Sequence, residues 1–138
     1  MISRLTICLK RTAVIVLLML LATTARADVP PSVLTQVGFV AEAGTLFAIC
    51  RDQEGISSQE YLDWARLENN VALLIEQVGK DFGDDTMFVA YHTSLFLAIS
   101  DPEIVQELLD HRKCDRKTLA AGKQWISDAQ AWFEQVKQ

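Results

Sequence analysis

Two cysteines, Cys50 and Cys114, are the residues of this chain with the most specific chemistry. Catalytic dithiols usually form a Cys-x-x-Cys motif, in which one thiolate has a lowered pKa and the other resolves a mixed disulfide. The 138-residue sequence contains no such motif. Paired cysteines in an oxidising compartment most often form a structural disulfide. We therefore predict a Cys50–Cys114 bond, with a redox or metal-linked role as the alternative.

Metal-ligand spacing appears at two places and is incomplete at both. His111 and Cys114 have a His-x-x-Cys spacing, but a closed zinc site would need further ligands, such as Cys50 and a carboxylate. The segment 81–85 resembles part of a calcium loop, because hard cations prefer clustered carboxylates. Its glycine comes too early, however, and a closing glutamate is missing. We predict neither a metal nor another cofactor.

Tyr91, His92 and Ser94 interrupt the most apolar stretch of the chain, residues 87–99. A histidine and hydroxyls inside a buried element can line a pocket or act as acid, base or nucleophile, because such surroundings shift pKa values. More often they form the wetter face of a helix, with hydroxyls bonded to helix carbonyls. No nucleophile signature surrounds Ser94. The three residues are a candidate pocket, and the sequence favours a non-enzymatic role over an enzyme.

Two sets of charged residues are candidates for binding a partner. The acidic set lies in two predicted loops and comprises Asp52, Glu54, Asp84 and Asp85. The basic set stands out on an acidic chain and comprises Arg112, Lys113, Arg116 and Lys117. The acidic set would meet a basic partner and the basic set would steer an acidic one. Part of the basic set is also explained by the negative end of a helix dipole.

Trp125 and Trp132 are seven positions apart and therefore share one face of a predicted helix, with Phe133 beside Trp132. Tryptophan is enriched at interface hot spots, but an aromatic stripe with helical spacing usually belongs to the core. We interpret this face as core, with an interface as the alternative.

The first 27 residues have the three-part pattern of a secretory signal peptide. A basic start is followed by an apolar run at 13–22 and by Ala25-Arg26-Ala27. The run of ten residues is short of the roughly 20 that span a bilayer. We expect cleavage after Ala27, which removes Cys8, and a periplasmic or secreted protein without stable membrane insertion. An uncleaved anchor is the alternative.

Cleavage would change the charge of the protein. The segment 1–27 holds four of the 13 Lys and Arg residues and none of the 18 Asp and Glu residues, so the formal net charge moves from −5 to −9. An acidic protein is repelled by nucleic acids and by anionic membrane surfaces. The remaining residues, 28–138, are enough for one domain with one core.

Hydrophobic periodicity and capping signals predict five helices in this domain. The first spans about 32–51, and a Ser57–Glu60 capping box starts the second, which should end at Gly79. The third is a central buried helix at 87–99. The fourth follows an Asp101 cap and Pro102, and the fifth starts at an Asp115 or Thr118 cap and continues to about Val136. The predicted fold is a compact, single-domain, all-α bundle of four to five helices with one disulfide.

These features predict an exported helical binding protein that acts by protein–protein interaction, such as a periplasmic inhibitor or immunity-type protein. One alternative is an accessory subunit of envelope assembly or of a secretion system. Another is a small enzyme or ligand carrier that uses the Tyr91, His92 and Ser94 face. A homodimer is compatible with each of these roles.

Overall fold

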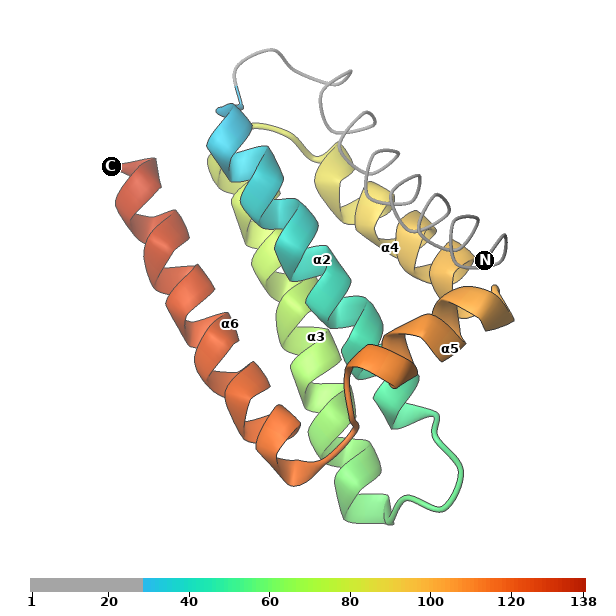
Figure 1. Cartoon of the computed structure of the whole chain (residues 1–138). Helices are drawn as coiled ribbons and strands as arrows, with labels where there is room; N and C mark the ends of the chain where they lie inside the picture. The colour runs from blue at the N-terminus through green and yellow to red at the C-terminus, as the bar shows by residue number, and fades with distance from the viewer. Residues whose placement is uncertain (1–28) are drawn as a thin grey trace.

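The computed structural model describes residues 29–138, which form five helices and no strand (Figure 1). The helices are α2 (Pro31–Arg51), α3 (Ser58–Asp81), α4 (Thr86–Ile99), α5 (Pro102–His111) and α6 (Arg116–Lys137). The predicted all-α bundle is confirmed. The predicted signal peptide, residues 1–27, lies outside the described residues.

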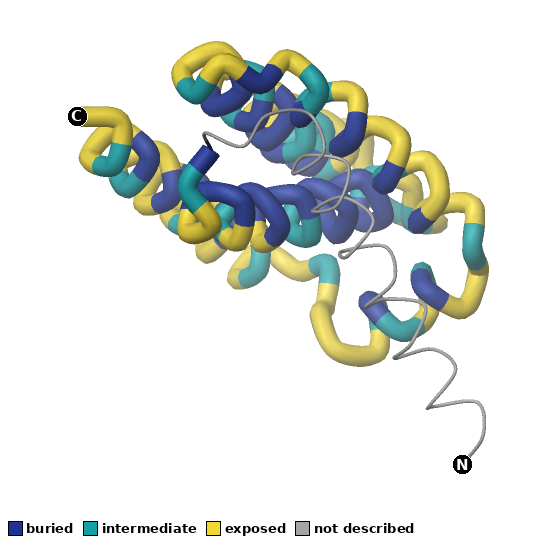
Figure 2. The backbone as a smooth tube through the Cα atoms, turned by 90° about the horizontal axis from the view of Figure 1, so that it is seen from above, coloured by how far each residue is buried: buried dark blue, intermediate teal, exposed yellow. Residues whose placement is uncertain are grey.

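Helix α2 is the centre of the bundle. It packs against α3, α4 and α6, and it is buried along most of its length (Figures 1 and 2). By length and composition α2 would be able to cross a membrane, but 72% of its apolar window is buried inside the protein. Its apolar character is therefore accounted for by its position as a core helix.

The prediction that 87–99 forms the central buried helix is wrong. Helix α4 packs one face on the bundle and leaves Val89 64% and Phe96 67% exposed. The physical reason lies in the size of the side chains. Helix α2 carries Gly44 and Ala48 among its buried residues, so neighbouring helices can approach it closely from several sides. Helix α4 covers α2 and α3 from one side only, through Met87, Ala90, Tyr91, Ser94 and Ala98.

Side-chain caps start helices α3, α5 and α6, as the sequence predicts. The Ser57 hydroxyl accepts from the Glu60 amide at 3.2 Å, and the Ser57 amide donates to the Glu60 carboxylate at 3.0 Å. Asp101 accepts from the Glu103 amide at 3.0 Å, and Asp115 accepts from the Thr118 amide at 2.8 Å. Each bond satisfies an amide that the first helical turn leaves without a partner.

Helix α3 continues two residues beyond the predicted end at Gly79, to Asp81. Gly79 is buried under the turn that follows, and a Cβ at this position would collide with the main-chain carbonyl of Asp84. The turn itself is made by Gly83, which has a φ of 69°. Gly79 is therefore required by close packing rather than by a helix end.

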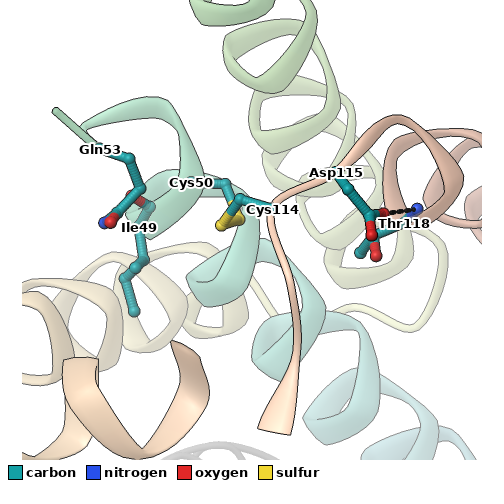
Figure 3. The surroundings of a disulfide bond; sticks show 6 residues. All are labelled: Ile49, Cys50, Gln53, Cys114, Asp115 and Thr118. Carbon is teal, nitrogen blue, oxygen red and sulfur yellow. Dashed lines mark hydrogen bonds between the residues drawn. A yellow bond between two sulfur atoms is a disulfide. The ribbon is translucent and has the colours of Figure 1, made fainter. Parts of the chain in front are cut away.

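The predicted disulfide between Cys50 and Cys114 is present, with the two Cα atoms 5.4 Å apart (Figure 3). Cys50 is fully buried in the last turn of α2, and Cys114 lies in the connection between α5 and α6. Helix α5 packs mainly against α4. Its residues Ile104 and Leu108 form a small cluster with Ala98 of α4 and Ile49 of α2, and this cluster is separate from the main core. The bond therefore ties the α5–α6 connection to the central helix.

Removal of the disulfide is expected to destabilise the domain strongly. The two cysteines are 64 positions apart, for which loop-closure entropy gives roughly 4 kcal/mol. We expect the double variant Cys50→Ala/Cys114→Ala to lose about 2–4 kcal/mol of unfolding free energy, measured by urea denaturation. A reductant should destabilise the wild type and leave the double variant unchanged. Two free thiols in the non-reduced exported protein would contradict the assignment.

A second prediction concerns Gly44, at which α2 approaches α3 and α4. A Cβ there would overlap the Tyr91 hydroxyl and would lie 2.7 Å from Val71 Cγ1. We expect Gly44→Ala to cost about 1–3 kcal/mol through overpacking, although alanine favours helix. In a Tyr91→Phe background the cost should be smaller, because the hydroxyl is gone. Equal costs of Gly44→Ala in both backgrounds, measured by urea denaturation, would refute the contact.

Candidate functional site

The acidic set of predicted partner-binding residues is divided between the two ends of the bundle. Asp52 and Glu54 lie in the turn between α2 and α3, whereas Asp84 and Asp85 lie in the turn between α3 and α4. Helix α3, with 24 residues, separates the two turns by about 36 Å at 1.5 Å per residue. The two acidic turns therefore do not form one surface.

Asp84 does not face solvent. Its side chain is 1% exposed, and one carboxylate oxygen accepts from the Thr86 amide at 2.9 Å and from the Thr86 hydroxyl at 2.6 Å. These bonds fix the start of α4, while Asp85, the N-cap residue, makes no side-chain capping bond. Burial removes Asp84 from any docking surface of the folded protein, and Asp85 remains exposed at this end.

The turn between α2 and α3 keeps its polar residues accessible. Asp52 is paired with Arg51, whose Nε lies 3.2 Å from Asp52 Oδ1, and Glu54 is exposed. Two exposed apolar side chains at the start of α3, Tyr61 and Leu62, line an open hollow beside this turn. The hollow is shallow, so it offers a contact surface rather than a pocket.

The residues of the predicted pocket point in different directions. Tyr91 is buried and its hydroxyl donates to Glu68 Oε1 at 3.1 Å. Ser94 is also buried, and its hydroxyl has no hydrogen-bond partner in the described part of the chain. His92 is exposed, with its ring 4.4 Å from that of Phe88. The three side chains do not converge on one cavity.

Glu68, in α3, is not among the candidate site residues predicted from the sequence. In the structure its carboxylate accepts from Tyr91 and lies 3.8 Å from Arg51 Nη1, so it links α2, α3 and α4. Burial raises the pKa of the Tyr91 phenol well above its ordinary value, and the negative charge of Glu68 raises it further. Tyr91 is separated from Glu68 by 23 positions in the sequence, so no local sequence pattern predicts the contact between them.

Among the described residues, a concave groove with a volume of about 620 Å³ lies between α2 and α6. It is closed at one end by the last turn of α5. Its lining comprises Gln36, Phe39, Glu42, Ala43, Leu46, Phe47, Leu108, His111, Arg112, Thr118, Ala121, Gly122 and Trp125. Binding sites for small ligands have volumes of about 300–1,000 Å³ and similar, mainly apolar walls. The groove, called here the α2–α6 groove, is therefore large enough to hold a ligand or part of a partner.

Small residues at the bottom create the α2–α6 groove. Gly122 brings α6 so close to α2 that a Cβ there would lie 2.9 Å from the ring of Phe47. Ala43 and Ala121 leave the space above this contact open. Phe39 stands at the edge and is 55% exposed, and Trp125 is half-buried in the wall. The groove therefore presents aromatic surface to solvent.

The predicted basic set lies at the α5 end of this groove. Arg112 is part of the lining, and Lys113, Arg116 and Lys117 follow as exposed residues around the connection to α6. Asp115, in the middle of the set, caps α6, because its carboxylate accepts a hydrogen bond from the Thr118 amide (Figure 3). Hydrogen bonds from Thr118 hold the pKa of Asp115 below its usual value, and the charges of Lys113 and Lys117 lower it further.

The two tryptophans of α6 are neither fully buried nor fully exposed. Trp125 and Trp132 both pack against the main core as half-buried residues, and Trp132 also contacts the ring of Phe133 at 5.2 Å. Trp125 belongs to the core and to the α2–α6 groove at once. Phe39 was the available sequence signal for the groove, because this large apolar residue lies off the i, i+3, i+4 spacing of Val33, Val37 and Val40.

Residues 29–138 contain no cluster of three or more His, Cys, Asp or Glu side chains that would hold a metal ion. Asp81, within the segment that resembles a calcium loop, is paired with Lys137 at 3.5 Å. Comparison with known proteins gives no match to a protein-family model, to a curated protein or to a solved structure. The functional interpretation therefore depends on the geometry of the grooves and charges.

The buried Tyr91 predicts a loss of stability at alkaline pH. Because the folded-state pKa is raised, the unfolded chain ionises above about pH 10 while the folded one stays protonated. The free energy of unfolding should therefore be constant with respect to this group below about pH 10 and should fall by about 1.4 kcal/mol per pH unit above it. Tyr91→Phe should cost about 1–2 kcal/mol at neutral pH, through the lost hydrogen bond, and should flatten the alkaline decline. Urea denaturation of the wild type and of Tyr91→Phe at about pH 8 and pH 11 gives the loss of unfolding free energy of each protein over this range. Subtracting one loss from the other removes the contribution of the lysines, which both proteins share. Parallel declines would contradict it.

Proposed function

We propose that the mature chain is an exported binding protein that acts by protein–protein interaction and uses the α2–α6 groove as its docking site. The observation that carries this proposal is a groove with aromatic side chains that is open to solvent, on a protein of acidic net charge. Isolated apolar residues at a surface are ordinary, whereas a concave group of them indicates binding. An inhibitor or immunity-type protein of the periplasm fits this description.

Export is supported by the disulfide and by the predicted signal peptide. Disulfides such as Cys50–Cys114 persist in oxidising compartments and are rare in the cytosol. The acidic charge expected after cleavage is suited to a soluble envelope protein that does not bind nucleic acid. These points support a periplasmic or secreted location.

Binding is better supported than catalysis. Among the residues that line the groove only Glu42, His111 and Arg112 are titratable, and the remaining lining is apolar, small or uncharged. The enzyme or carrier alternative has less support, because Tyr91 and Ser94 are buried while His92 faces outward. The accessory-subunit alternative expects an exposed tryptophan face, but Trp125 and Trp132 are half-buried against the core.

Rigidity also favours a binding role. The disulfide fixes the α5–α6 connection, and with it one end of the groove, to the last turn of α2. A site that is already ordered loses little conformational entropy when a partner binds, so more of the contact energy appears as affinity. A small exported scaffold with such a site needs no further catalytic machinery.

Two alanines of α6 provide a matched test of this function. Ala121 lines the groove, whereas its neighbour Ala120 is equally exposed outside it. Ala121→Trp fills the groove, and Ala120→Trp adds the same side chain elsewhere. We expect the tagged mature protein and its Ala120→Trp variant to retain the same partner from the envelope extract of its source. Ala121→Trp should retain at least about tenfold less, a change of about 1.4 kcal/mol.

Unchanged thermal unfolding of both variants would show that the fold is intact. Equal retention by the two variants, or no retained protein at physiological salt, would overturn the proposed docking site.

A further inference from the structure

The charges around the α2–α6 groove are distributed unevenly. Residues 28–138 contain nine Lys and Arg residues, and four of these lie between positions 112 and 117. All four are exposed at the α5 end of the groove. The acidic excess of the protein therefore does not extend to this end, where positive charge dominates.

The position of Arg112 is fixed by the surrounding backbone. Its amide donates to the Leu108 carbonyl at 2.8 Å, which closes the last turn of α5, and Cys114 is bonded to α2 two residues later. The main chain that carries the guanidinium is thus held between two anchored points. Because the main chain at Arg112 is already anchored, only the side chain has to become ordered when a ligand binds there.

Two carboxylates, Asp110 and Asp115, lie beside the four basic residues, so the formal charge between positions 110 and 117 is +2, from four positive and two negative groups. Asp110 accepts from Gln106 Nε2 at 2.8 Å, and Asp115 accepts from the Thr118 amide at 2.8 Å. At physiological ionic strength charges are screened beyond about 8 Å. A ligand carboxylate at this end would therefore interact with the basic residues around Arg112 more strongly than with the net charge of the protein.

The rest of the groove lacks the positive charge of its α5 end. The α2 wall is lined mainly by the apolar residues Phe39, Ala43, Leu46 and Phe47. An apolar side chain placed along this wall would contact Phe39 and Trp125. The lining therefore suits a ligand with one acidic end and an apolar body.

The length of the groove suits a short helix. Its α2 wall extends from Gln36 to Phe47, which corresponds to about 17 Å at 1.5 Å per residue. Three turns of an α-helix have nearly the same length, at about 5.4 Å per turn. Grooves of this kind bind amphipathic helices through apolar side chains at positions i, i+3, i+4 and i+7.

We propose that the occupant of the α2–α6 groove is an amphipathic helix of a partner protein with an acidic end. Its apolar face packs against Phe39, Leu46 and Trp125, and its terminal carboxylates pair with Arg112. This assignment depends on the proposed function, since it names the chemistry of the partner that docks in the same groove.

Two synthetic helical peptides test the assignment. Both carry leucine at i, i+3, i+4 and i+7, and they differ only in glutamates or lysines at one end. We expect the glutamate peptide to bind the mature protein at least about tenfold more tightly than the lysine peptide, by fluorescence anisotropy. Arg112→Glu should remove this preference. Arg66→Glu, the same charge change at an exposed site on α3, should leave it in place.

Equal or tighter binding of the lysine peptide would overturn the assignment, as would an equal effect of Arg66→Glu and Arg112→Glu. Absence of peptide binding, together with a partner whose retention is sensitive to Ala121→Trp, would refute the acidic helix and leave the proposed function standing. Peptide binding that Ala121→Trp does not weaken would place the peptide outside the groove and count against both.

Discussion

The burial of α2 on most of its sides is the constraint on which the rest of the structure depends. An apolar helix of 21 residues is stable in water only when other elements cover it, since each Å² of apolar surface removed from water contributes about 25 cal/mol. Helices α3, α4 and α6 supply that cover, and each uses one face to do so. Glycines at the close contacts, Gly44 in α2 and Gly122 in α6, determine how near the helices can come. The α2–α6 groove is the part of the α2 surface that this arrangement leaves partly uncovered.

The disulfide compensates for the weak attachment of α5. This helix contributes Ile104 and Leu108 to a small cluster that is separate from the main core, and short helices with few apolar contacts open at low free-energy cost. The bond between Cys50 and Cys114 prevents the α5–α6 connection from moving away with it. The bond thereby couples the stability of the fold to the proposed docking site, because the same connection carries the basic end of the groove.

Local signals made most of the fold predictable from the sequence, and non-local packing limited the prediction. The Ser57 box, the Asp101 and Asp115 caps and Pro102 act within one turn, so they located the helix starts. The disulfide was predictable because residues 28–138 contain two cysteines, which are too far apart in the sequence for a Cys-x-x-Cys motif. The peripheral place of α4, the buried role of Glu68 and the α2–α6 groove depend on residues from distant segments. One sequence without aligned relatives contains no pattern that relates such segments to each other.

The proposed specificity of the α2–α6 groove requires both its apolar wall and its basic end. An aromatic groove alone would accept many apolar segments that become exposed in an oxidising compartment, and a basic cluster alone would attract any anion. The acidic excess elsewhere on the protein repels acidic proteins that lack an apolar face to hold them. The proposed partner would be retained only if it placed apolar side chains beside Phe39 and Trp125 and a carboxylate beside Arg112 at the same time. Because the disulfide anchors the connection that carries Arg112 to α2, the length of the partner segment would be part of what the proposed site recognises.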